Sequence, residues 1–231
     1  MDHFQQIYAS QAAHYHEMIT VEDVDGNLPS ALRTIGPLRG KRILDLGTGT
    51  GRLPLLLARE GALMVGLDLY ADMLKENAAQ RARSGGSWGL VQGDMRALPF
   101  PAACADVVTA GWAIGHLRAW FDADWQDQIG LVLREMHRVA APEGAILILE
   151  TLTTGSLTPA PPSQGLAEYY AWLEGTWGFS RQAIRTDYQF QTVDEAVART
   201  AFFFGEELAA EIRRQAWARL PEWTGLWIKQ V

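Results

Sequence analysis

Short apolar runs alternate with helical patterns between residues 41 and 150, and this alternation constrains the fold more than any other feature of the sequence. The apolar runs lie at 41–46, 62–69, 87–94, 105–112 and 145–150. Runs with so little polar alternation are typical of strands covered on both faces. Parallel strands joined by helical crossovers are the arrangement that such an order favours. We therefore predict an α/β fold with a doubly wound, mostly parallel sheet.

The segments between these runs have the composition and spacing of helices. Residues 50–61 carry leucines on one stripe, and residues 71–86 are rich in good helix formers. Residues 125–139 place apolar side chains at i, i+3 and i+4 spacing. Pro-Glu-Gly at 142–144 predicts a turn into the fifth strand.

The rest of the chain predicts a single domain, 1–231, with additions on both sides of this core. We expect a helical amino-terminal cap at 1–36, a ligand-binding core at 37–150, a substrate lid with helical elements at 151–186, and a completing strand-helix-strand segment at 187–231. Within the last two parts we predict strands at 183–190 and 222–231 and one long helix at 192–215. A capping box of Thr192 and Glu195 begins that helix.

Composition excludes several classes of function. The chain has 231 residues, 48% of them hydrophobic, and a net charge of −7, which disfavours a nucleic-acid partner. Its single cysteine, Cys104, leaves no intramolecular disulfide, and no Cys/His cluster has metal-site spacing. No apolar run approaches the ~20 residues of a membrane helix, and the amino terminus lacks the pattern of a signal peptide. We expect a cytoplasmic protein without a metal site or membrane insertion.

A glycine-rich turn follows the first predicted strand in the sequence RILDLGTGTGRLPLLLA, residues 42–58. Gly47, Gly49 and Gly51 lie where doubly wound sheets bind ligands, at the carboxyl end of a strand. Glycine permits positive φ and lets backbone N–H groups approach a ligand closely. The glycines alone are equally consistent with a tight turn that only reverses the chain.

Aspartates at three successive strand ends narrow the choice of ligand. Asp45 precedes the first glycine by two residues, where a carboxylate repels a pyrophosphate and attracts an ammonium group. The glycine spacing is G-x-G-x-G and not the G-x-G-x-x-G of dinucleotide sites. Asp68 can accept hydrogen bonds from ribose hydroxyls, and Asp94 from an adenine amine. Each aspartate alone is typical of a helix cap, but together they indicate a ligand with an ammonium group and a ribose.

Four motifs in this order resemble the class I S-adenosylmethionine-dependent methyltransferases, closest to the small-molecule type of ubiquinone and menaquinone biosynthesis. They read ILDLGTGTG, VGLDLYADML, VQGDMRALPF and ADVVTAGWAIGHL. The resemblance covers residues 37–150 and extends to VLREMHRVAAPEGAILILE. It implies a Rossmann-like, seven-stranded sheet with an antiparallel last strand, and S-adenosyl-L-methionine as the cofactor.

The resemblance also implies roles for individual residues. The backbone at Gly47, Thr48 and Gly49 would meet the methionine part of the cofactor, and Asp45 its ammonium group. Asp68 would hold the ribose, and Asp94 the adenine amine. The remaining implied cofactor residues are Leu69 and Met95 around the adenine, Ala110 and Gly111 beside the methionine, and Tyr8 or Tyr15 closing over the site.

The acceptor side carries fewer signals. The cofactor supplies the reactivity, so the protein mainly positions a small-molecule methyl acceptor. His116 is the candidate general base, although a hydrogen bond to a loop explains it equally well. An apolar or aromatic acceptor would suit a pocket built from Trp112, Tyr169, Tyr170 and Trp172, whereas Trp88 and Trp120 are expected in the core.

Two other classes of function stay open at this level. A nicotinamide-dependent oxidoreductase would explain the acid after the second strand, but it must account for Asp45. A non-methylating S-adenosylmethionine-binding protein of the same fold would contain the same cofactor motifs. Stabilisation by NAD would indicate the oxidoreductase, and stabilisation by S-adenosylhomocysteine would exclude it. Release of S-adenosylhomocysteine that depends on an acceptor would distinguish a methyltransferase from the non-methylating protein.

Overall fold

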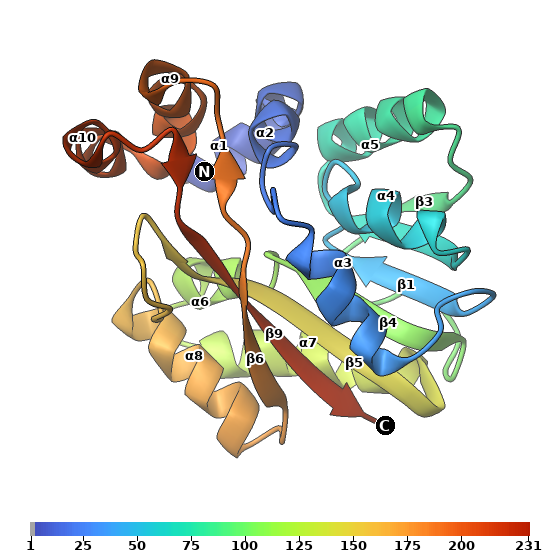
Figure 1. Ribbon diagram of the computed structural model, residues 1–231. Helices are drawn as coiled ribbons and strands as arrows, with labels where there is room; N and C mark the ends of the chain where they lie inside the picture. Colours follow the sequence, from blue (N-terminus) through green and yellow to red (C-terminus); the bar gives the residue numbers. More distant parts are fainter. Residues whose placement is uncertain (1–2) are drawn as a thin grey trace.

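The computed structural model describes residues 3–231 and is built on one seven-stranded sheet (Figure 1). The strand order is β3-β2-β1-β4-β5-β9-β6. These strands are β1 (Arg42–Leu46), β2 (Leu63–Asp68), β3 (Gly89–Gln92), β4 (Ala105–Gly111), β5 (Ala140–Thr154), β6 (Ser180–Arg185) and β9 (Glu222–Gln230). Neighbours from β3 to β5 pair in parallel, and β9 runs antiparallel to both β5 and β6. The predicted doubly wound sheet with an antiparallel last strand is confirmed.

Helices cover both faces of this sheet (Figure 1). They are α1 (His3–Ser10), α2 (Ala12–Ile19), α3 (Asn27–Leu32), the 3-10 helix η1 (Arg33–Ile35), α4 (Arg52–Arg59), α5 (Ala71–Ser84), α6 (Gly115–Trp120), α7 (Trp125–Val139), α8 (Gln164–Gly175), α9 (Val193–Phe204) and α10 (Glu206–Gln215). One apolar cluster joins the sheet to α6, α7 and α8, and a second joins it to α3 and α4. The apolar stripe predicted at 125–139 is the buried face of α7.

The helices α1, α2, α9 and α10 gather at one end of the sheet, with a small sheet of β7 (Tyr188–Gln189) and β8 (Arg219–Leu220), whereas α5 packs on β2 and β3 (Figure 1). Met18 and Ile19 of α2 pack there against Tyr188 and Ile212 in one apolar cluster. The amino-terminal cap and the carboxyl-terminal segment therefore form a single structure, although nearly the whole chain separates them.

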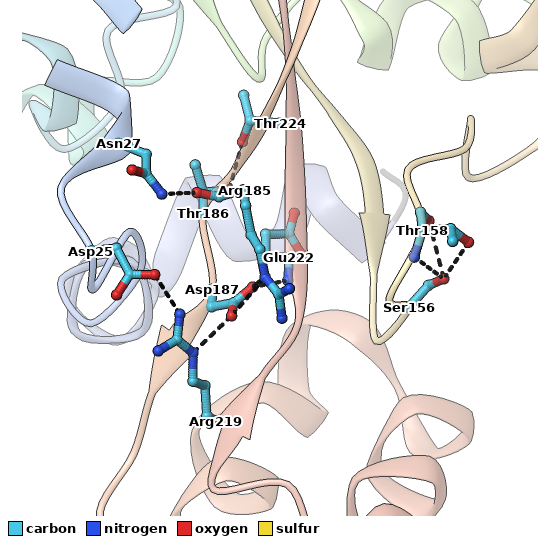
Figure 2. A network of polar contacts seen from close by, with 10 residues as sticks. All are labelled: Asp25, Asn27, Ser156, Thr158, Arg185, Thr186, Asp187, Arg219, Glu222 and Thr224. Carbon is cyan, nitrogen blue, oxygen red and sulfur yellow. Dashed lines mark hydrogen bonds and ion pairs between the residues drawn. The ribbon is translucent and has the colours of Figure 1, made fainter. Parts of the chain in front are cut away.

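A buried polar network joins this end structure to the main sheet (Figure 2). The carboxylate of Asp187 accepts hydrogen bonds from Arg185, Arg219 and the backbone N–H of Glu222. Arg219 also pairs with Asp25 of the amino-terminal cap. Asp187 is buried and two guanidinium groups neutralise it, so this contact holds the cap and the carboxyl-terminal strands in a fixed relation.

The prediction of one continuous strand at 183–190 is wrong. It divides into β6 and β7, and β6 begins at Ser180, three residues earlier than expected. Thr186 and Asp187 lie between β6 and β7, and their side chains are buried. Thr186 contacts Thr224, and Asp187 contacts Arg185 and Arg219, so these two residues leave the β-ladder (Figure 2). Strand propensity alone does not reveal such a break.

Two further predictions need correction. The helix predicted at 192–215 is two helices, because Gly205 has φ 84° and ψ 178° and leaves the helical conformation. The turn predicted at 142–144 lies inside β5 as an irregularity. Ala105 pairs with Ala140, but Val107 pairs with Ala145, and Glu143 has φ 62°. The extra residues bulge out of the strand without ending it.

Candidate active site

The glycine-rich turn has no room for side chains at its first position. Gly47 has φ 65°, and a Cβ built there would lie 2.4 Å from the Cβ of Ala113. Ala113 follows β4, so the turn after β1 touches the chain after β4 directly. Glycine at this position lets the backbone form the wall of a cavity between the two strand ends.

A cavity of about 290 Å³ lies at the carboxyl ends of β1, β2, β3 and β4. Most of the residues predicted to bind the cofactor line it. They are Tyr8, Tyr15, Gly47, Gly49, Asp68, Leu69, Asp94, Met95 and Gly111, together with Trp112 and His116 from the predicted acceptor side. Segments from four strand ends and the amino-terminal cap thus form one site.

Asp68 organises one wall of this cavity. Its carboxylate accepts hydrogen bonds from the N–H of Gly49 at 2.8 Å and of Tyr70 at 2.9 Å. The residue is only 6% exposed, and burial raises its pKa while these backbone N–H groups oppose the rise. One side chain therefore joins the glycine turn to the end of β2 and also lines the cavity.

Asp94 lies beside a guanidinium group. Arg96 donates to both of its oxygens at 2.6–3.1 Å and donates from Nη1 to Gln128. The hydrogen bonds from Arg96 lower the pKa of Asp94. The carboxylate is thus ionised at neutral pH and is positioned as an acceptor.

Asp45, Thr48 and Ala110 lie behind the cavity wall and are not among its lining residues. Asp45 is 1% exposed and accepts a 2.6 Å hydrogen bond from Thr109, its partner in the register of β1 and β4. Burial raises the pKa of Asp45 to about 6. The carboxylate links two strands beneath the glycine turn, and its predicted contact with an ammonium group stays a prediction.

His116 lies where the chain leaves β4 and enters α6. Its Nε2 is 2.8 Å from the hydroxyl of Tyr8, and its ring stacks on Trp120 with 5.3 Å between centroids. Tyr8 comes from α1 at the start of the chain. The amino-terminal cap therefore holds the imidazole at the cavity wall.

A second cavity of about 860 Å³ adjoins the first. The two cavities share five lining residues, and all five side chains are aromatic or imidazole. They are Tyr8, Tyr15, Trp112, His116 and Trp120. A molecule in the second cavity would meet a ligand of the first across this boundary, which we call the junction.

Buried charged groups line the second cavity. Glu22 pairs with Arg52 at 2.7 Å, and the Arg52 guanidinium lies 3.9 Å from the ring centre of Trp112. Glu150 accepts a 2.8 Å hydrogen bond from the N–H of Gly115, and burial raises its pKa to about 8. Glu222 is 2% exposed, and burial followed by the nearby charge of Glu22 raises its pKa.

The aromatic residues predicted for the acceptor pocket are only partly there. Trp112 lines both cavities, and Tyr170 lines the second and donates a 2.7 Å hydrogen bond to the carbonyl of Thr151. Tyr169 and Trp172 line neither cavity. They face the core, where both contact Trp125 of α7 edge-on. Their helical spacing turns them to the side of α8 opposite the cavities.

The segment predicted as a lid, 151–186, contributes unequally to the second cavity. Thr151–Thr154 continue β5, residues 180–185 form β6, and α8 packs on the main core. Pro162, Ser163 and Leu166 from this segment line the cavity. A role in specificity stays a prediction for the loop before α8.

Sequence reasoning missed several residues that line these cavities. Glu150 is the last residue of the strand predicted at 145–150, so the strand-end argument that identified Asp68 and Asp94 could have found it. Trp120 was expected in the core, yet it lines both cavities. Glu22, Arg52 and Glu222 carry no local signal, since only the packed cap brings them together.

Comparison with known proteins agrees with this geometry. Residues 44–148 match the family model of a methyltransferase domain. A demethylmenaquinone methyltransferase of Geobacillus kaustophilus is 32% identical over 154 residues, which cover 63% of this chain and 62% of that protein. Residues 44–148 thus form a domain similar to those of methyltransferases, in agreement with the motifs of the sequence.

Two further likenesses support the domain assignment. A malonyl-[acyl-carrier protein] O-methyltransferase of Pectobacterium atrosepticum is 28% identical over 59% of this chain and 46% of that protein. The YcgJ protein of Bacillus subtilis has the same fold, with a TM-score of 0.56, 17% identity, and coverage of 88% of this chain and 96% of that one. The matches thus span less than two thirds of the length of these curated relatives.

The residues of the methyltransferase domain fit S-adenosyl-L-methionine. The turn at Gly47 excludes side chains, Asp68 and Asp94 present carboxylate acceptors, and Leu69 and Met95 add apolar surface. Across residues 3–231, no three His, Cys, Asp or Glu side chains form a group that could hold a metal ion. None of the helices in that range has both the length and the apolar character needed to cross a membrane.

Proposed function

We propose that this methyltransferase domain transfers a methyl group from S-adenosyl-L-methionine to a small molecule bound in the second cavity. The observation that carries the proposal is the junction, where five side chains line both cavities. The cofactor supplies an electrophilic methyl group when bound, so the protein must bring an acceptor to it. Holding two reactants in contact can lower the free-energy barrier of the reaction by up to ~7–11 kcal/mol.

Different residues of the chain contact the cofactor and the acceptor. Asp68 and Asp94 hold the nucleoside end of the cofactor, and the glycine turn accommodates its methionine end. His116 faces the junction and takes the acceptor's proton when the reacting atom carries one, with Tyr8 orienting the ring through their hydrogen bond. The single cysteine suits a reducing compartment, so we place the reaction in the cytoplasm.

Acceptor specificity is assigned to the loop before α8 and to the aromatic walls. Pro162 and Ser163 of this loop, and Leu166 in the first turn of α8, line the second cavity but not the first. Exchanging residues 156–163 is expected to change acceptor choice while the affinity for S-adenosylhomocysteine is retained. A collapse of that affinity would remove this loop from the acceptor site.

The deciding experiment measures binding and transfer separately. S-adenosylhomocysteine, but not NAD, is expected to raise the melting temperature of the full chain. Incubation with S-adenosyl-L-methionine and a library of small acceptors should then release S-adenosylhomocysteine only when an acceptor is present. Stabilisation by NAD alone would favour the oxidoreductase alternative, and binding without transfer to any acceptor would favour a non-methylating protein.

A further inference from the structure

The wall of the second cavity is rich in carboxyl groups. Six carboxyl groups line it, against two guanidinium groups: Glu22, Asp122, Glu150, Glu207, Glu211 and Glu222 face Arg52 and Arg118. Glu22 pairs with Arg52, Asp122 with Arg118, and Glu211 with Arg214. No ion pair within residues 3–231 neutralises the other three carboxyl groups.

Two of these three carboxyl groups are deeply buried. Glu150 is 5% exposed and Glu222 is 2% exposed. The Oε2 atom of Glu222 has no hydrogen-bond partner among the described residues, and the same is true of Oε1 of Glu22. A buried carboxyl oxygen without a partner costs free energy, so a donor that enters the cavity would be favoured.

Glu150 lies close to the junction between the two cavities. Its Oε1 accepts the N–H of Gly115, and the next residue is His116, which lines both cavities. Burial, and then the nearby Glu150 and Glu222, raise the pKa of Tyr170, which lines the same cavity. Both carboxyl groups thus line one cavity, and Glu150 is the one next to the junction.

Aromatic rings complete the same cavity. Phe203 and Phe204 from α9 line it, and the ring centre of Phe203 lies 5.4 Å from that of the junction residue Tyr15. Ring faces attract cations, and they also receive the apolar part of a ligand. Carboxylates beside aromatic rings are the combination that binds an organic ammonium group.

We propose that the methyl acceptor is an amine, with its ammonium group attracted by the carboxyl groups of Glu150 and Glu222 in the second cavity and its apolar body against the rings of that cavity. This inference rests on the proposed function. Burial keeps the pKa of Glu150 near 8 without a cation, and an ammonium group would favour its ionised form.

The chemistry of transfer is consistent with these groups. An ammonium nitrogen first gives its proton to a carboxylate of the cavity or to His116, which leaves the nitrogen a free electron pair. That pair forms the nitrogen–carbon bond while the carbon–sulfur bond breaks and its electrons stay on sulfur. The positive charge thus passes from sulfur to nitrogen, where the carboxylates stabilise it.

The test compares three ligands with one carbon skeleton. Tryptamine, tryptophol and indole-3-propionate carry an ammonium, a hydroxyl and a carboxylate group at equivalent positions. Each is titrated by calorimetry into the full chain saturated with S-adenosylhomocysteine. We expect tryptamine to bind about tenfold or more tightly than tryptophol, and indole-3-propionate to bind more weakly than either.

Matched variants assign the preference to the carboxyl groups. Glu150→Gln and Glu222→Gln should each weaken tryptamine binding about tenfold and change tryptophol binding less than about twofold. Glu17→Gln, at an exposed position that lines neither cavity, should change neither. Retained affinity for S-adenosylhomocysteine verifies that each variant is folded.

The outcomes separate the two proposals. If S-adenosylhomocysteine binds but tryptamine binds no better than tryptophol, or binds not at all, the amine proposal is overturned and the methyl-transfer proposal stands. Unchanged tryptamine affinity in both glutamine variants also overturns it. Failure of the native chain to bind S-adenosylhomocysteine would overturn both.

Discussion

The hydroxyl of Tyr8 lies 2.8 Å from Nε2 of His116, although 108 residues separate them in the chain. Tyr8 belongs to the first helix, and His116 follows the fourth strand. Their rings lie edge to face with centroids 5.3 Å apart. The amino-terminal cap thereby contributes to the junction where the two cavities meet.

Tyr8→Phe removes this hydrogen bond and keeps the ring. We expect kcat/KM to fall about 3- to 10-fold, as for the loss of an ordinary hydrogen bond. His116→Ala should cost about 10²- to 10⁴-fold for an acceptor that must lose a proton. A pH–rate profile separates the two variants, because only the histidine variant loses the fall in rate toward acidic pH that protonation of a general base causes. Equal activity of native protein and His116→Ala would remove His116 from catalysis.

Asp68→Ala should weaken binding of S-adenosylhomocysteine about 10- to 100-fold. The carboxylate accepts two backbone N–H groups and lines the cofactor cavity, so its removal affects both the ligand and the shape of the turn. Calorimetric titration measures the loss. Asp72→Ala, at an exposed position paired with Lys75, is the control and should bind normally. Similar affinities in both variants would contradict the assignment.

Gly47→Ala should destabilise the fold more than Gly85→Ala does. The two glycines have φ 65° and 66°. An alanine at either position would therefore lose about the same 1–2 kcal/mol of stability from its left-handed backbone conformation. Only at Gly47 would the new Cβ meet another atom, at 2.4 Å from Ala113, whereas nothing lies within 4 Å at Gly85. We expect an additional loss of about 1–3 kcal/mol in the free energy of unfolding, measured in urea. Equal losses would show that the turn can relax.

Glu150→Gln should stabilise the protein at alkaline pH. The pKa of this glutamate rises from 4.5 to about 8 on folding, so the folded state binds a proton that the unfolded state releases. The stability of the native protein therefore falls as the pH rises from about 4.5 to 8, by a few kcal/mol at most. The glutamine variant lacks this loss. Its melting temperature relative to the native protein should increase across that pH range, and a constant difference would contradict the assignment.

The strands and most residues that line the first cavity could be predicted from local pattern. Continuous apolar runs located the parallel strands, and the rule that ligands bind at strand ends identified Asp68 and Asp94, which line that cavity. The same rule applies to Glu150, the last residue of the strand predicted at 145–150. Local pattern did not show that Asp45 lies outside the cavity wall, where its carboxylate accepts a hydrogen bond from Thr109 across the β1–β4 pair.

The sequence by itself determined the parallel sheet, the glycine turn and the acids at its edge, because periodicity and glycine conformation act over a few neighbouring residues. Only the tertiary structure decided that Tyr8 meets His116 and that Glu22 and Arg52 lie near Glu222. These contacts depend on how the first two helices pack against α9, α10 and the small sheet. Burial of apolar faces drives that packing. Because the hydrophobic effect is not directional, the local sequence does not show which apolar faces will meet. The acceptor cavity lies between those packed faces, and so its chemistry emerged only from the fold.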